Sequence, residues 1–370
     1  MSEIQTIFLE NTLEKALRKA LELGVEDFAG KAYRENETLI RFSNNSVSVI
    51  SCTDTSKIDI YIGYKKRRIF ATSESVDEKH LLKIIERMIR SAENLEPYQY
   101  YTNLPRGKVE YQVIPKLYDY KTIEESELFD IIDGTINAAL GEGAVKTSGM
   151  LSVKRGKVVL ITSGEREGEY RYSLVQLCIR AFSNEELSGQ WAAVSTFIDD
   201  LDYEEVGRKA GRLATTCRDV RTVTPGKYDV LFSPMVMGNL LNLIGFEVSA
   251  FYVDMGLSAF INKIGERVAT ENVTIIDNPT MEGNPGGKPF DDEGVPTREV
   301  NIIEKGVLKT YLHNSTTAKK YKTETTGHAG VLVPVPHSLI VNTGDIEEDD
   351  ALRELKEGLY ITNVWYTRFH

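Results

Sequence analysis

Three kinds of residue in this 370-residue chain could bind a metal or take part in catalysis: five histidines, three cysteines and a run of three consecutive carboxylates. The histidines are scattered, and no H-E-x-x-H pair would place two imidazoles on one helix face. His313 and His328 are close enough in sequence to converge, so a shared metal site stands beside ordinary polar or turn histidines as an interpretation. The cysteines are too widely spaced for a zinc knuckle or a disulfide framework and favour a reducing compartment: Cys52, Cys178 and Cys217.

The carboxylates follow a Pro/Gly cluster. Asp291, Asp292 and Glu293 precede Gly294, a combination typical of a tight turn in which short acidic side chains accept hydrogen bonds from nearby backbone amides. Their oxygens could also bind a hard cation, but no second acidic cluster at EF-hand spacing accompanies them. We therefore favour a turn that caps a strand.

Composition limits the class of protein. Hydrophobic content of 41% and charged content of 27% are ordinary for a soluble globular chain. The net charge of −11 argues against a nucleic-acid or anionic-membrane surface, which would need clustered positive charge. No run of about 18 apolar residues predicts a membrane span, and the N-terminus lacks a secretory signature, so we expect a cytoplasmic protein.

The first 222 residues have the same order of elements twice. A capping box at residues 11–14 predicts a helix that ends before Gly24, and an antiparallel meander follows over residues 27–72. Further capping boxes at residues 75–78 and 122–125 predict two more helices. Strands are then expected between residues 150 and 198, followed by a helix from Asp202 to Cys217. Residues 11–94 and 123–218 both follow the order helix, strands, helix, which suggests a structural duplication.

After residue 222 the pattern changes to short strands and turns. Residues 227–232 predict a strand, residues 236–250 a helix, and residues 300–311 a hairpin around Gly306. We therefore predict an α+β fold with two domains. Residues 1–222 would form an α/β domain, and residues 223–370 a mainly antiparallel β domain with the acidic turn at one end of its sheet.

Four segments in the second half resemble the TldD/PmbA family in the family's order. They are residues 225–234 (PGKYDVLFSP), 290–297 (FDDEGVPT), 302–309 (IIEKGVLK) and 314–318 (NSTTA). The resemblance implies a cytosolic metallopeptidase system of two related subunits. One subunit carries zinc on an H-E-x-x-x-H helix, and the other, called TldE or PmbA, lacks that motif.

The stretch equivalent to the zinc helix is residues 238–247. By this resemblance the two histidine positions fall on Asn242 and Glu247, and the glutamate position falls on Leu243. A leucine cannot activate water, and an amide with a carboxylate offers no imidazole, so the Lewis-acid and general-base roles are unfilled. The resemblance is therefore to the PmbA/TldE-like branch, and we interpret the stretch as a packed helix with a polar edge.

The family continues past the Trp365 region into further strands that supply the zinc branch's cysteine ligand, whereas this chain ends at His370. The second domain is thus expected to lack its last strands. Residues 359–366 read as a core strand without its neighbour, to be explained by a truncated record, a cleaved chain or a strand supplied by another molecule.

These inferences give one functional hypothesis and two alternatives. The hypothesis is a subunit without catalytic residues or cofactor that helps enclose a chamber for unfolded peptides, with zinc only in a TldD-like partner. The carboxylates at 291–293 could steer or cap such a peptide, although a purely structural role is at least as well supported. The alternatives are an autonomous metal-dependent peptidase that uses His313 and His328, and a homodimeric scaffold without activity.

Overall fold

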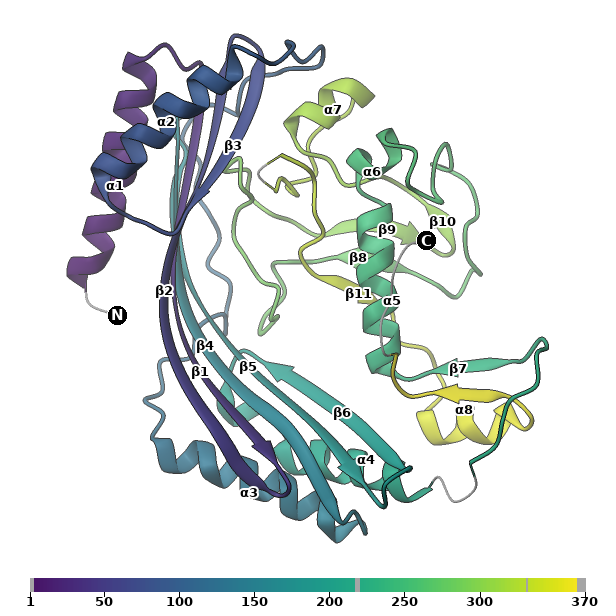
Figure 1. Cartoon of the computed structure of the whole chain (residues 1–370). Coiled ribbons are helices and arrows are strands. Elements are labelled where there is room, and N and C mark those ends of the chain that lie inside the picture. Colours follow the sequence, from purple (N-terminus) through teal and green to yellow (C-terminus); the bar gives the residue numbers. More distant parts are fainter. Residues whose placement is uncertain (1–2, 217–219, 331, 365–370) are drawn as a thin grey trace.

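The computed structural model describes residues 3–216, 220–330 and 332–364. Its centre is a six-stranded antiparallel sheet in the order β3-β2-β1-β4-β5-β6 (Figure 1). The strands are β1 (Asp27–Ser43), β2 (Ser46–Tyr64), β3 (Arg67–Ser73), β4 (Lys146–Thr162), β5 (Glu167–Phe182) and β6 (Ser188–Ser195).

The sheet is built from two similar halves. The first is α1 (Glu3–Glu22), β1 to β3 and α2 (Glu78–Ala92); the second is α3 (Glu125–Gly141), β4 to β6, the short η1 (Ile198–Asp200) and α4 (Tyr203–Thr216). The halves join where β1 pairs antiparallel with β4. The predicted repetition of helix, strands and helix is therefore confirmed at the level of element order.

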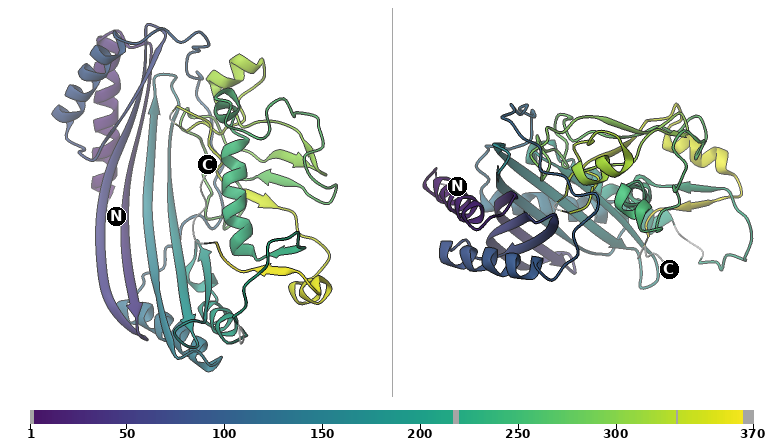
Figure 2. Two further views of the ribbon diagram at one scale, coloured as in Figure 1. Left: turned by 45° about the vertical axis from the view of Figure 1, so that its right-hand side comes forward. Right: turned by 90° about the horizontal axis from the view of Figure 1, so that it is seen from above.

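Strand alternation gives the sheet two different faces. Phe28 and Ala32 of β1 pack with α1 and α2, and Ile40 and Phe42 pack with α3 and α4. The residues between them, such as Lys31, face the other way, toward the second half of the chain. The sheet curves around that second half, which lies on its inner side (Figures 1 and 2).

The second half of the chain consists of short elements, and we call residues 220–364 the C-terminal unit. Its four-stranded sheet has the order β10-β9-β8-β11, and a separate two-stranded sheet pairs β12 with β7. The strands are β7 (Val230–Phe232), β8 (Ile275–Asp277), β9 (Val300–Glu304), β10 (Val307–Leu308), β11 (Leu339–Val341) and β12 (Leu359–Ile361). The helices are α5 (Pro234–Glu247), α6 (Ala250–Asp254), α7 (Ser315–Tyr321) and α8 (Glu348–Leu355). The α+β class is confirmed.

The predicted hairpin is also confirmed. β9 and β10 are joined by Lys305 and Gly306, whose φ values of 45° and 77° are those of a turn with two left-handed residues. The division near residue 222 into two domains stays a prediction about independent folding. No helix in the described part of the chain is long and apolar enough to cross a bilayer.

Several predicted element ends were wrong. Helix α1 begins at Glu3, so the expected cap at Asn11 lies inside the helix. Helix α2 is capped by Asp77, which accepts from His80 N, and α3 starts after Glu124 without a side-chain cap. Capping residues are common within helices too, so a four-residue pattern alone does not fix a boundary.

The last strand also differs from the prediction. β12 has a neighbour, β7, with which it pairs in parallel, and its three residues are only half-buried rather than in a core. Residues 365–370, which complete the predicted segment, and Cys217 lie outside the described residues.

Helix α4 approaches α3 so closely that Gly207 tolerates no side chain. A β-carbon there would lie 2.2 Å from the carbonyl oxygen of Thr135. We predict that Gly207→Ala lowers the free energy of unfolding by about 1–3 kcal/mol, because the two backbones must separate.

The matched control is Gly238→Ala in helix α5, where no atom lies within 4 Å of the added carbon. This change should stabilise the protein by roughly 0.5–1 kcal/mol through helix propensity. Urea denaturation measures both variants. Equal stability of Gly207→Ala and wild type would contradict the close helix contact.

Candidate functional site

The acidic turn forms as the sequence predicts. Asp291 Oδ1 accepts from Glu293 N at 3.0 Å and from Val295 N at 2.9 Å, and its Oδ2 accepts from Ala329 N at 2.9 Å. Gly294 has a φ of +72°, which closes the turn. The side chain of Asp291 is completely buried and therefore holds the turn together.

Burial also changes the protonation of this carboxyl. Removal from water, followed by the nearby charge of Glu293, raises the pKa of Asp291 to about 8, against the opposite effect of the amides of Ala329 and Val295. Glu293 is buried as well, and burial raises its pKa. Its carboxylate accepts from Ser315 N at 2.9 Å and from the Ser315 hydroxyl, so it anchors the start of α7.

Asp292 points out of the turn and connects it to the large sheet. Both of its carboxylate oxygens lie 2.8 Å from Lys31 Nζ on β1. Beside it, the ring of Phe290 packs on Tyr111 and Tyr170, with ring centres 4.7 and 5.3 Å away. The turn is thus one of the places at which the C-terminal unit docks on the sheet; another is Leu332, whose carbonyl oxygen accepts from Arg68 on β3 at 2.7 Å.

A cavity of about 380 Å³ opens beside this docking point, and we call it the Lys288 pocket. Its walls come from β1, β4 and β5 of the sheet and from two segments of the C-terminal unit. Its lining residues are Lys31, Tyr33, Val158, Tyr170, Tyr172, Pro285, Gly286, Gly287, Lys288, Phe290, Asp292, Pro336 and His337. Of the three predicted turn carboxylates, Asp292 is the one that lines this pocket.

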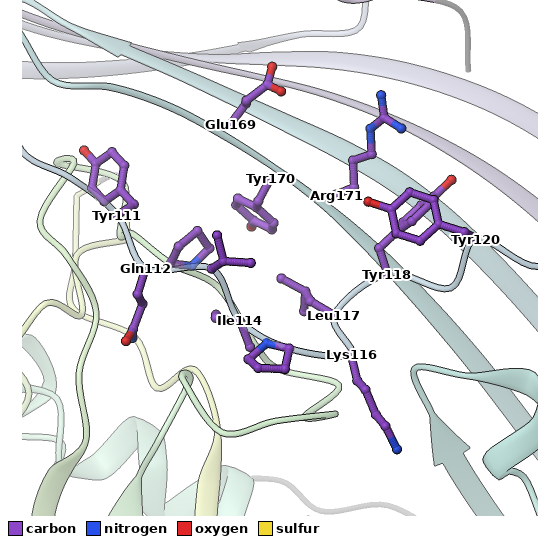
Figure 3. A pocket seen from close by; sticks show the side chains of 13 residues that line it. Tyr111, Gln112, Ile114, Lys116, Leu117, Tyr118, Tyr120, Glu169, Tyr170 and Arg171 are labelled. Atoms are coloured by element: carbon purple, nitrogen blue, oxygen red, sulfur yellow. The ribbon is translucent and has the colours of Figure 1, made fainter.

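A larger cavity of about 650 Å³ lies next to it, and we call it the β5-edge groove (Figure 3). It runs between residues 111–120 and residues 169–171 of β5. Tyr170 points into the groove toward Ile114 and Leu117, whereas Glu169 and Arg171 point the other way (Figure 3). Tyr170 lines both the groove and the Lys288 pocket.

The backbone of β5 is open along the groove. β6 pairs with β5 only from Val175 onward, so Glu167–Leu174 have no strand on that side among the described residues. Ser173 N donates to Leu117 O at 3.0 Å, which shows that odd-numbered residues direct their backbone groups outward. By the same alternation the N–H and C=O of Glu169 and Arg171 face the groove, where no hydrogen bond from a described residue reaches them.

His313 and His328 occupy separate environments. His313 Nδ1 lies 3.2 Å from the Thr317 hydroxyl, whereas His328 stacks on His337 with ring centres 4.7 Å apart. His328 Nε2 lies 3.2 Å from Asp277 Oδ1. In the described part of the chain, no three His, Cys, Asp or Glu side chains are grouped so that they could hold a metal, so the geometry does not support the metal site inferred from His313, His328 and the turn.

Helix α5 likewise does not fit zinc. Asn242 is exposed and Leu243 is half-buried and aliphatic. The Glu247 carboxylate accepts from Ala259 N at 3.1 Å, so it fastens the loop after α6. These three side chains offer no imidazole, and the interpretation of a structural helix with a polar edge stays a prediction.

Apart from Asp292, sequence reasoning missed the polar residues that line the Lys288 pocket. Lys31, Tyr170 and Lys288 sit in ordinary strands or loops, and His337 is one isolated histidine. The only available signal was the alternation on β1 and β5, which predicts that Lys31 and Tyr170 lie on one face of each strand.

Comparisons with known proteins agree on one family. Residues 225–370 match the PmbA/TldA metallopeptidase C-terminal domain, and residues 118–218 match the central domain of the same family. A metalloprotease from Methanocaldococcus jannaschii is 29% identical over 94% of this chain and 80% of its own length. A metalloprotease from Methanothermobacter thermautotrophicus is 32% identical over 43% of this chain and 36% of its own length.

Solved structures show the same fold. TldE from Thermococcus kodakarensis superposes with a TM-score of 0.81 at 20% identity, over 96% of this chain and 83% of that one. A Thermotoga maritima protein described as a candidate modulator of a DNA gyrase gives 0.82 at 24% identity, also over 96% and 83%.

The raised pKa of Asp291 predicts a pH dependence of stability. In the folded protein this carboxyl stays neutral up to about pH 8, whereas in the unfolded chain it ionises near 3.8. The unfolded state therefore binds fewer protons between these values, and the free energy of unfolding should fall as pH rises, by at most about 1.4 kcal/mol per pH unit.

Denaturant titrations at pH 6.5 and pH 8 test this prediction. This window lies at and above the ordinary histidine pKa of 6.5, so it reduces the opposite contributions of His313 and His337, whose pKa values are lowered by burial. The slope should become flatter in Asp291→Asn and stay unchanged in Asp345→Asn, which removes an exposed carboxylate. An equal slope in wild type and Asp291→Asn would show that this group does not titrate in that range.

Proposed function

The chain belongs to the TldD/PmbA metallopeptidase family, and on that premise we propose that it is a PmbA/TldE-like subunit without its own zinc. In this proposal it joins a TldD-like, zinc-bearing partner in the cytoplasm and forms one wall of a chamber for unfolded peptides. The observation that carries the proposal is helix α5, on which Asn242 and Leu243 replace metal-binding and water-activating groups and Glu247 is engaged with Ala259.

The β5-edge groove supports the peptide-binding part of the proposal. An extended peptide can pair its backbone with the outward N–H and C=O groups of Glu169 and Arg171, as in strand addition. Such pairing needs no particular side chains, so it suits unfolded substrates of varied sequence. Val113 and Tyr120, which are 91% and 78% exposed, line the groove and offer apolar contacts to the peptide's side chains.

The first test asks whether the chain is active alone. We expect the purified chain to hold less than stoichiometric zinc by elemental analysis and not to cleave an unstructured fluorogenic peptide. Added to a zinc-bearing relative from the same organism, it should co-elute in size-exclusion chromatography and give hydrolysis that EDTA abolishes.

A partner whose H-E-x-x-x-H glutamate is changed to glutamine is the control, and it should form an inactive complex. Stoichiometric zinc with chelator-sensitive hydrolysis by the chain alone would overturn the proposal in favour of an autonomous peptidase. A stable homodimer that ignores the zinc-bearing relative would favour the scaffold.

The second test addresses the β5 edge. Proline is tolerated in an edge strand where its missing N–H would face outward, so Arg171→Pro should fold while removing one donor from the groove. We predict that it weakens binding of an unstructured peptide about tenfold by fluorescence anisotropy.

The matched control is Arg171→Ala, which removes the side chain but keeps the N–H and should bind within about twofold of wild type. Methylation of alternate peptide nitrogens should weaken binding in the same way. Unchanged affinity of Arg171→Pro for the unmodified peptide would exclude main-chain pairing at this edge.

A further inference from the structure

One buried atom of the Lys288 pocket, His337 Nδ1, lacks a hydrogen-bond partner among the described residues. Lys288 and Tyr170 line the same pocket, and neither the Nζ of Lys288 nor the Tyr170 hydroxyl forms a hydrogen bond with a described residue. We propose that this pocket binds the C-terminal residue of a peptide, with the carboxylate at Lys288 and Tyr170 and the last backbone N–H at His337. The inference rests on the proposed function, because the peptide would reach the pocket along the β5-edge groove.

Lys288 supplies the positive charge. The other lysine of the pocket, Lys31, is already paired with both oxygens of Asp292 at 2.8 Å. No carboxylate in the described part of the chain lies within ion-pair distance of Lys288, and its burial lowers its pKa. The carboxylate of a ligand would form an ion pair with this ammonium group, whereas a metal cation would be repelled by it.

His337 supplies an acceptor. Its Nε2 lies 3.1 Å from the carbonyl oxygen of Gly327, which can only accept, so Nε2 carries the proton of the neutral ring. Burial and the charge of Lys288 lower the pKa of His337 well below 6.5, so the ring is neutral at pH 7. Nδ1 is then a buried acceptor without a hydrogen-bond partner among the described residues, and a ligand N–H would satisfy it.

These groups match a peptide terminus better than a free anion. A C-terminal residue carries a carboxylate and, two bonds away on the same α-carbon, an N–H donor. Inorganic anions and carboxylate side chains do not combine the two groups on one atom. Three aromatic rings form an apolar wall for the side chain of the last peptide residue: those of Tyr33, Tyr172 and Phe290. The hydroxyls of the two tyrosines already donate hydrogen bonds, to Asp59 and Glu35 respectively.

The position of the pocket agrees with a peptide that ends there. Tyr170 belongs to both cavities, and consecutive residues of one loop divide them, with Pro289 on the groove and Lys288 and Phe290 on the pocket. A strand paired along residues 169–171 can therefore continue past Tyr170 into the pocket. The negative charge of Asp292 would repel the peptide carboxylate, but the ion pair with Lys31 neutralises the charge of Asp292.

The test compares one unstructured nine-residue peptide as the free acid and as the C-terminal amide, by fluorescence anisotropy. We expect the acid to bind at least tenfold more tightly to the wild-type chain. Lys288→Met should remove this preference, so that acid and amide bind this variant equally. Tyr170→Phe should reduce the preference severalfold, because it deletes only the hydroxyl.

Folding of Lys288→Met is checked by its thermal midpoint, which should not fall, because the change removes a partly buried charge that has no ion pair among the described residues. Lys83→Met on α2 is the charge-matched control and should keep the preference. Equal binding of acid and amide to wild type, or a preference that survives Lys288→Met, would overturn the inference.

The source of the carboxylate is tested by an amidated peptide with an internal glutamate. If it binds as tightly as the free acid and depends on Lys288, the terminal assignment is wrong. The two proposals can fail separately. If the acid and the amide bind equally, and both lose affinity in Arg171→Pro, only the carboxylate site is refuted. If no peptide binds at all, both the carboxylate site and the peptide-binding groove are refuted.

Discussion

The arrangement of this protein depends on the docking of the acidic turn on the inner face of the curved sheet. Asp292 meets Lys31, Phe290 enters an aromatic cluster, and the carbonyl oxygen of Gly294 accepts from Arg166 at 2.8 Å. Burial of the Phe290 ring contributes about 1.5–3 kcal/mol. A partly buried ion pair adds little net stability, but removal of one partner is costly because the other charge is then left unpaired. The Asp292–Lys31 pair therefore fixes the position of the turn.

This docking creates the two cavities. Residues of the segment that leads into the turn line both cavities, with Pro289 on the groove and Lys288 and Phe290 on the pocket. The Lys288 pocket lies between the sheet and the C-terminal unit, and the groove lies along the part of β5 that β6 does not reach. Stability and the proposed peptide-binding wall therefore come from the same contact, with Asp291 holding the turn and Asp292 placing it.

Chemical roles in the site divide between groups that are already satisfied and groups that are not. The turn carboxylates bond backbone amides, a serine or a lysine, and Glu247 bonds a loop amide, so these acids have structural partners. Groups of four residues have no such partner among the described residues: the outward N–H and C=O groups of Glu169 and Arg171, the Nζ of Lys288 and the Nδ1 of His337. A ligand gains most binding free energy where it satisfies polar groups that have no partner in the protein, so these groups beside the cavities are the expected contacts of a peptide.

The sequence by itself determined the local features. Strand alternation and helical spacing gave the repeated order of elements, the hairpin at Gly306 and the hydrogen bonding within the acidic turn, because each depends on neighbours a few residues away. The sequence also showed that positions 242 and 247 hold Asn and Glu in place of the histidines of the zinc motif. Only the tertiary structure joined Asp292 to Lys31, 261 residues apart, and brought His337 beside Lys288. Periodicity states which side of a strand is apolar, but not which distant loop will cover it, and that choice decided the site.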